Sequence, residues 1–160
     1  MILPGHVAAA YLAAKLSGVS MQGAMAASMA PDLVDKPTRW LAGLTPNDRI
    51  PAHTALFWGA TTLFAALFVD GGFARGWATG YAVHLACDQV NASLNPGRIY
   101  FFWPFKRYRF HRGPTGLESS LQDFSLPSLL IEAGLAIVGL AVWLHSRRAR
   151  ADGSTSSSLT

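Results

Sequence analysis

The chain has 160 residues, of which 51% are hydrophobic and 14% charged, with a formal net charge of +4. An ordinary soluble domain is roughly 25% charged, so this composition excludes a largely disordered chain and is not typical of a soluble surface. The length fits one domain, and the single cysteine excludes both a disulfide framework and a cysteine-rich zinc site.

Two short apolar stretches open the chain, at residues 5–17 and 20–31. Each is shorter than the roughly 20 residues that span a bilayer. Small side chains would let the two stretches approach closely as a helical hairpin. They are Ala9, Ala13, Gly23 and Ala27.

Longer apolar stretches follow at residues 53–70 and 74–94, on either side of Asp70-Gly71-Gly72. The glycine pair predicts a turn, and therefore a second hairpin. Residues 126–145 are the clearest membrane-spanning candidate. Together these stretches predict an all-α, multi-pass membrane bundle of about four to five helices.

Prolines predict loops over residues 31–52 and 95–125. We therefore expect a membrane-embedded helical domain at residues 1–146. Residues 147–160 begin with arginines and end in a low-complexity polar sequence, which predicts a basic segment followed by a disordered tail.

Residues 98–112 alternate basic and aromatic side chains. Such a segment can stack on and neutralise nucleic acid, or it can lie at a membrane interface with its basic groups on anionic lipid headgroups. The apolar composition favours the interface, so the expected partners are the bilayer and anionic lipids, with no nucleic acid. The sequence does not determine the oligomeric state.

Ionisable residues within apolar segments are costly and point to a functional site. Five such residues lie at similar distances from the two hairpin turns, counted at about 1.5 Å per helical residue. If the two hairpins pack in the same sense, these five side chains lie together at one end of the bundle. Imidazole and carboxylate groups suit zinc, and also manganese or iron. A hydrogen-bonded polar network is the alternative. The predicted ligands are His6, Asp32, His53, His84 and Asp88.

Several motifs in this order resemble the YdjM-like family, described as LexA-binding, inner-membrane-associated hydrolases and as membrane-bound metal-dependent hydrolases. The resemblance runs from Gly5 to about His111. Its motifs are Gly5-His6, Pro31-Asp32 with Asp35, the segment Asp48–Thr54, Gly80-Tyr81 with His84 and Asp88, and Trp103-Pro104. Two positions depart from the family pattern: Asp48 replaces a histidine, and Asp35 comes one residue late.

The resemblance implies a bacterial-type inner membrane location and metal-assisted hydrolysis. Asp35 is then a candidate general base or a partner of the metal ligands, with pairing to Lys36 as the alternative. Asp48 is a weaker candidate base, or a solvated loop residue. Arg49 would stabilise charge on a phosphate or ester oxygen, or contact a lipid headgroup.

The placement of the aromatic loop beside this site favours an amphiphilic substrate, such as a phospholipid or a lipid-linked phosphate. A non-catalytic protein that uses the cluster as a structural or partner-docking centre is the alternative function. A transporter of metal or protons is disfavoured, because the ionisable groups gather toward one side instead of lining the whole membrane depth.

Overall fold

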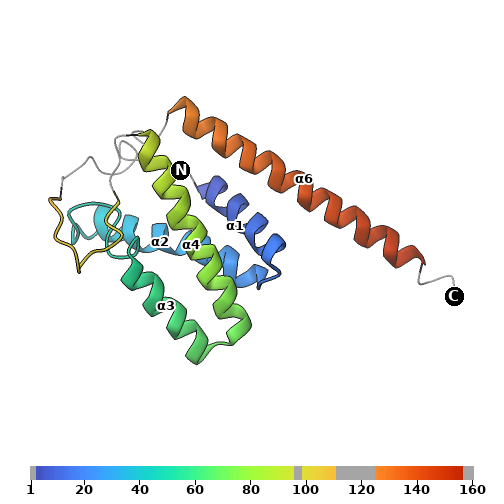
Figure 1. Ribbon diagram of the computed structural model, residues 1–160, viewed down its shortest axis with the longest axis horizontal. Coiled ribbons are helices and arrows are strands. Elements are labelled where there is room, and N and C mark those ends of the chain that lie inside the picture. Colours follow the sequence, from blue (N-terminus) through green and yellow to red (C-terminus); the bar gives the residue numbers. More distant parts are fainter. Residues whose placement is uncertain (1–2, 96–98, 111–124, 157–160) are drawn as a thin grey trace.

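The computed structural model describes residues 3–95, 99–110 and 125–156, and every regular element within these ranges is a helix. Helix α4 is central and contacts each of the other four described helices (Figure 1). The all-α prediction is therefore confirmed for the described part of the chain. The helices are α1 (Leu3–Ser17), α2 (Met21–Trp40), α3 (Ala55–Phe68), α4 (Gly71–Leu94) and α6 (Leu126–Ser156).

Local side-chain caps determine where the helices begin. Thr54 precedes α3 and accepts a hydrogen bond from the Phe57 amide. Asp70 precedes α4 and accepts from the Phe73 amide at 2.8 Å. Because Asp70 is this cap, Gly71 and Gly72 form the first turn of α4 and not the predicted turn between the hairpin helices.

The prediction of a loop over residues 31–52 is wrong for its first part, because α2 continues through Pro31 and Pro37 to Trp40. A proline removes one intrahelical donor and opens the preceding turn, but a helix continues where neighbouring groups satisfy the freed backbone. The carbonyl that loses its donor at Pro31 is that of Ala27, and the Ser28 carbonyl one residue further on accepts a hydrogen bond from His84 Nδ1 at 2.7 Å. The longer helix places Asp32 and Asp35 on adjacent turns.

Helices α2 and α4 touch backbone to backbone. A Cβ atom at Gly80 would overlap the Ala24 backbone, and one at Gly76 would overlap the carbonyl of Ser20. A Cβ at Gly23 would meet the Phe73 carbonyl in the same way. Glycine at these contacts lets the helix axes approach closely, and this approach determines which side chains of the two helices meet.

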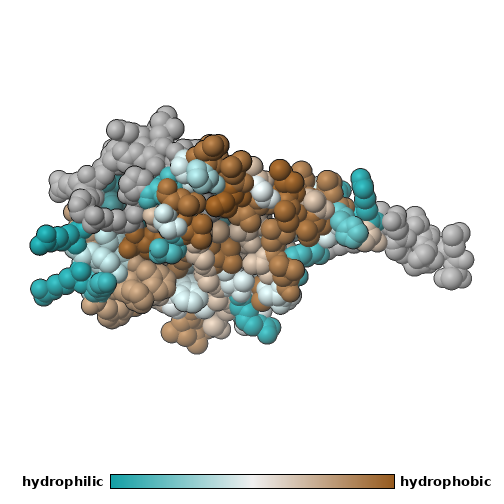
Figure 2. Space-filling model, turned by 45° about the horizontal axis from the view of Figure 1, so that its top comes forward, coloured by the Kyte–Doolittle hydropathy of each residue, from teal (hydrophilic) through white to brown (hydrophobic). Residues whose placement is uncertain are grey.

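Helix α6 is the one described helix that is long and apolar enough to cross a membrane, over Leu126–Ala149, within which an 18-residue window has a mean hydropathy of 1.9. Its 24 residues extend roughly 36 Å, which exceeds the roughly 30 Å of a bilayer core. Most of its surface is exposed, and apolar surface predominates on the face drawn in Figure 2. A single candidate span leaves the multi-pass arrangement a prediction.

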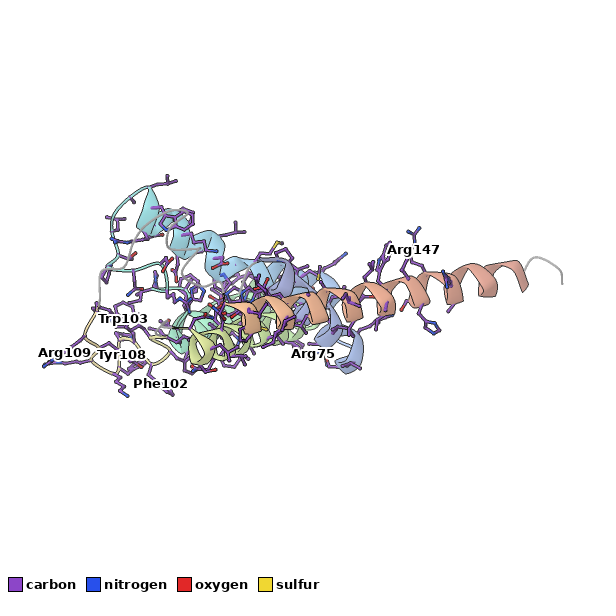
Figure 3. The ribbon with its side chains drawn as sticks, turned by 90° about the horizontal axis from the view of Figure 1, so that it is seen from above. Arg75, Phe102, Trp103, Tyr108, Arg109 and Arg147 are labelled. Carbon is purple, nitrogen blue, oxygen red and sulfur yellow. The ribbon has the colours of Figure 1, made fainter. Side chains whose placement is uncertain are left out.

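Two groups of aromatic and basic side chains lie far apart along the molecule. Phe102, Trp103, Tyr108 and Arg109 gather at one end, and Arg147 lies far along α6 (Figure 3). The Arg147 guanidinium packs over the Trp143 ring at 4.8 Å from its centroid, an arrangement suited to a membrane interface.

Helix α6 continues to Ser156. The sequence predicted that this helix ends at residue 145, so the helix extends into the segment predicted as a basic and disordered tail. Residues 157–160 lie outside the described ranges, as do Arg98, His111 and Arg112 of the basic aromatic loop.

We predict that Gly80→Ala lowers the thermal unfolding temperature in detergent, because the added methyl group forces α2 and α4 apart at a typical overpacking cost of about 1–3 kcal/mol. Gly59→Ala is the matched control, since Gly59 lies in α3 with open space around it and alanine favours a helix. Equal unfolding temperatures for the two variants would contradict the close packing described above.

Candidate metal centre

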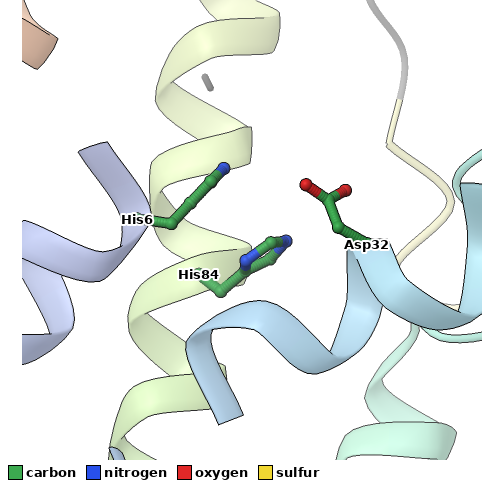
Figure 4. A group of neighbouring side chains, drawn as sticks. All are labelled: His6, Asp32 and His84. Carbon is green, nitrogen blue, oxygen red and sulfur yellow. The ribbon is translucent and has the colours of Figure 1, made fainter. Parts of the chain in front are cut away.

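The five predicted ligands converge from four parts of the chain. His6 comes from α1, Asp32 from α2, His53 from the loop before α3, and His84 and Asp88 from adjacent turns of α4. Figure 4 shows His6, Asp32 and His84 pointing toward one common space. The three histidine side chains are at most 2% exposed. The structure therefore brings together residues that are up to 82 positions apart, the separation of His6 and Asp88.

His53 is held by a buried carboxylate. Asp35 is fully buried and accepts hydrogen bonds from the Ala52 amide at 2.8 Å, the His53 amide at 3.1 Å and His53 Nδ1 at 2.7 Å. The carbonyl of Ala52 in turn accepts from the Tyr81 hydroxyl at 2.6 Å. With Nδ1–H donating to Asp35, the other ring nitrogen of His53 is directed into the cluster, as in the carboxylate–histidine pairs of metal sites.

His84 is oriented in the same way by a backbone group. Its Nδ1 donates to the Ser28 carbonyl, since a carbonyl can only accept, so its Nε2 carries the lone pair. That Nε2 lies 3.1 Å from His53 Nε2, and His53 Nε2 lies 3.2 Å from Asp88 Oδ2. Two imidazole nitrogens and a carboxylate oxygen at this spacing require a positive charge between them, either a proton or a metal ion.

His6 contributes two buried nitrogens. Its ring stacks on His84, with 3.9 Å between centroids and 19° between planes. Nε2 approaches Asp88 Oδ1 at 3.2 Å, but neither ring nitrogen makes a hydrogen bond of good geometry. Buried ring nitrogens that make no well-formed hydrogen bond are costly, and coordination to a metal would satisfy them.

These contacts test whether a metal fits. Nitrogen and oxygen atoms of His6, Asp32 and His84 lie within 4.8 Å of one another, and so do those of His53, His84 and Asp88. Buried imidazole and carboxylate groups, two of them oriented by hydrogen bonds to other groups, form a donor set suited to zinc, manganese or iron. The residues present therefore fit a divalent metal.

The remaining predicted residues differ in their distance from the cluster. Arg49 Nη1 lies 3.8 Å from Asp88 Oδ2, with the side chain 12% exposed. Lys36 pairs with Asp32 at 2.7 Å, not with Asp35 as the alternative interpretation had it. Asp48 is half-buried in the loop that carries Arg49, and its role stays a prediction.

Two groups that contribute to the site were not predicted from the sequence. The Ser28 carbonyl is a backbone group with no residue-type signal. Tyr81 was noted only as part of a motif, although its position three residues before His84 places it on the same helix face, next to the cluster.

The charge state of His53 follows from its surroundings. Burial alone lowers the pKa of this imidazole, but hydrogen bonds to Asp35 and Asp88 and the nearby charge of Asp32 raise the pKa to about 9. Without a metal, His53 is therefore protonated at neutral pH. A proton and a metal ion compete for its Nε2.

The sequence model of one protein family, described as YdjM inner membrane protein, matches residues 2–152. The match covers all five converging residues and confirms the resemblance carried by the motifs. No curated protein and no solved structure matches the chain.

We predict that the detergent-purified protein contains zinc, manganese or iron in stoichiometric amount by elemental analysis. The double variant His84→Ala/Asp88→Ala loses this metal, because it removes two adjacent ligands. His145→Ala, which changes an exposed histidine of α6, retains it. Near-zero metal in the parent after incubation with zinc and manganese would leave a hydrogen-bonded polar network.

We further predict that apparent metal affinity rises with pH, by up to about tenfold per unit, between about pH 6 and pH 8. Below a pKa of about 9 the His53 proton must leave before Nε2 can coordinate, so metal binding releases a proton. Calorimetric titration in buffers of different ionisation enthalpy measures this release. A pH-independent affinity would place His53 outside the ligand set, and His53→Gln serves as the comparison.

Proposed function

Because the chain belongs to the YdjM inner membrane protein family, we propose that it is a membrane-bound, metal-dependent hydrolase of an amphiphilic ester or phosphoester. The observation that carries this proposal is the convergence of His53 Nε2, His84 Nε2 and Asp88 Oδ2 in a buried site. The proposed ligands are His6, Asp32, His53, His84 and Asp88. When bound, a divalent metal supplies a Lewis acid and lowers the pKa of water.

Arg49 is the proposed substrate-binding group. Its Nη1 atom lies at the edge of the cluster, 3.8 Å from Asp88 Oδ2, and the side chain as a whole is 12% exposed. A planar guanidinium matches the oxygens of a phosphoryl group. In this position Arg49 would hold a substrate oxygen and stabilise the negative charge that develops there during bond cleavage.

Asp35 is proposed as a positioning residue, not as the general base. Three N–H groups already occupy its two oxygens, and it is fully buried. A carboxylate so engaged holds the His53 ring in place and fixes its tautomer. Asp48, half-buried beside Arg49, stays the candidate proton acceptor.

The membrane setting supports an amphiphilic substrate. Exposed aromatic side chains of the 99–110 segment, including Phe102 and Phe105, lie with Lys106 and Arg109 in one short stretch. This composition suits the headgroup layer of a bilayer with anionic lipids, so that substrates would be drawn from the membrane.

The test is hydrolysis of phospholipid, lipid phosphate and ester substrates by the metal-loaded protein, with chelation and metal re-addition as the first control. Stoichiometric metal without metal-dependent turnover on any of these substrates would favour a structural or partner-docking centre instead.

We predict that Arg49→Gln lowers kcat by about 100-fold or more, as removal of a charge-stabilising donor does, while metal content stays unchanged. Arg75→Gln is the matched control, because Arg75 is exposed on α4 and lies away from the Arg109 end of the molecule (Figure 3). Full activity in Arg49→Gln would remove this residue from the proposed machinery.

A further inference from the structure

A groove of about 280 Å³ runs along the C-terminal half of α2. Its described lining has a charged end, formed by Asp32 and Lys36, and continues as apolar surface. The apolar lining residues are Leu33, Pro37, Trp40 and Leu41. A lining with a charged end and an apolar remainder matches a molecule with a polar head and a hydrocarbon chain.

Asp32 connects this groove to the metal centre. Its side chain is 13% exposed, whereas the other four proposed ligands are 7% exposed or less. Its Oδ1 lies 3.6 Å from His53 Nε2. The centre is therefore most accessible at the carboxylate that also lines the groove.

Lys36 gives this end of the groove a positive charge. Its Nζ donates to Asp32 Oδ2 at 2.7 Å, and the side chain is 32% exposed. An ammonium group has three donors, so a headgroup oxygen can bind Lys36 without displacing Asp32. Charge complementarity thus favours an anionic headgroup.

The apolar part of the groove faces outward. Leu33, Pro37 and Leu41 follow one another at intervals of four residues, on one helix face, and the two leucines are 65% and 86% exposed. A row of exposed leucines on an inner membrane protein fits contact with acyl chains. The C-terminal end of α2 lies at the same end of the molecule as residues 99–110 (Figure 1).

We propose that this groove binds the hydrocarbon chain of a phosphoryl-headed membrane lipid, with Lys36 contacting the phosphate beside Asp32. This inference rests on the proposed function, because it makes the groove the substrate-chain subsite of the metal centre. Lys36 selects for the anionic head, and Leu33 and its neighbours bind the chain.

The test uses phosphatidic acid with a photoreactive diazirine near the end of one acyl chain, in phosphatidylcholine vesicles that contain the full-length protein. After irradiation, labelled peptides are mapped by mass spectrometry. We expect labelling within residues 33–41 that excess phosphatidic acid competes away and diacylglycerol does not. In Lys36→Gln, phosphatidic acid should compete no better than diacylglycerol.

Leu33→Ser should weaken competition by about tenfold, in keeping with the loss of a buried leucine contact. Leu63→Ser is the matched control, because Leu63 is similarly exposed, at 59%, but lies on α3. Labelling of residues 33–41 that is no stronger than at Leu63 and is not competed would be ordinary annular lipid, and it would overturn the groove proposal.

Labelling does not require turnover, so it separates this inference from the proposed function. Metal content is measured on the same samples. Competed labelling in a protein that binds no metal would support the groove proposal and contradict the hydrolase proposal. Uncompeted labelling in a metal-loaded, active protein would support the hydrolase proposal and contradict the groove proposal.

Discussion

The arrangement of this protein depends on the backbone contact between α2 and α4. Gly76 and Gly80 leave no side chain between the two helices, so the Ser28 carbonyl comes within hydrogen-bond distance of His84. Any residue larger than glycine at Gly80 would overlap Ala24 and separate these groups. The small residues that permit helix packing are therefore also what assembles the candidate metal centre.

Charge compensation is the second constraint. Asp32, Asp35 and Asp88 lie close together in a mostly buried region, and unpaired buried carboxylates are costly. Lys36 pairs with Asp32, Arg49 approaches Asp88, and His53 lies between Asp35 and Asp88. A divalent cation at the imidazole nitrogens would add positive charge at the place where the His53 proton now balances the carboxylates.

Several features of the molecule around this centre suit a membrane. The apolar helix α6 is long enough to span a bilayer, and Phe102, Trp103 and Tyr108 gather at the opposite end of the molecule from Arg147 (Figure 3). In the proposal made above, the groove beside Asp32 would give the buried centre an apolar approach. A substrate that stays in the membrane while its head reaches a polar site needs such an approach.

The sequence by itself determined the helical class and the pairing of His84 with Asp88, because these depend on local spacing: residues four apart share a helix face. It also singled out His6, Asp32 and His53 as ionisable residues at apolar segments, but their convergence depends on how the helices pack. It misjudged α2, since a proline disrupts a helix only locally, and α2 continues through Pro31 and Pro37 to Trp40. Only the tertiary structure decided that Asp35 orients His53. That contact joins groups 17 and 18 residues apart, and sequence periodicity carries no information about which backbone amides a buried carboxylate will meet.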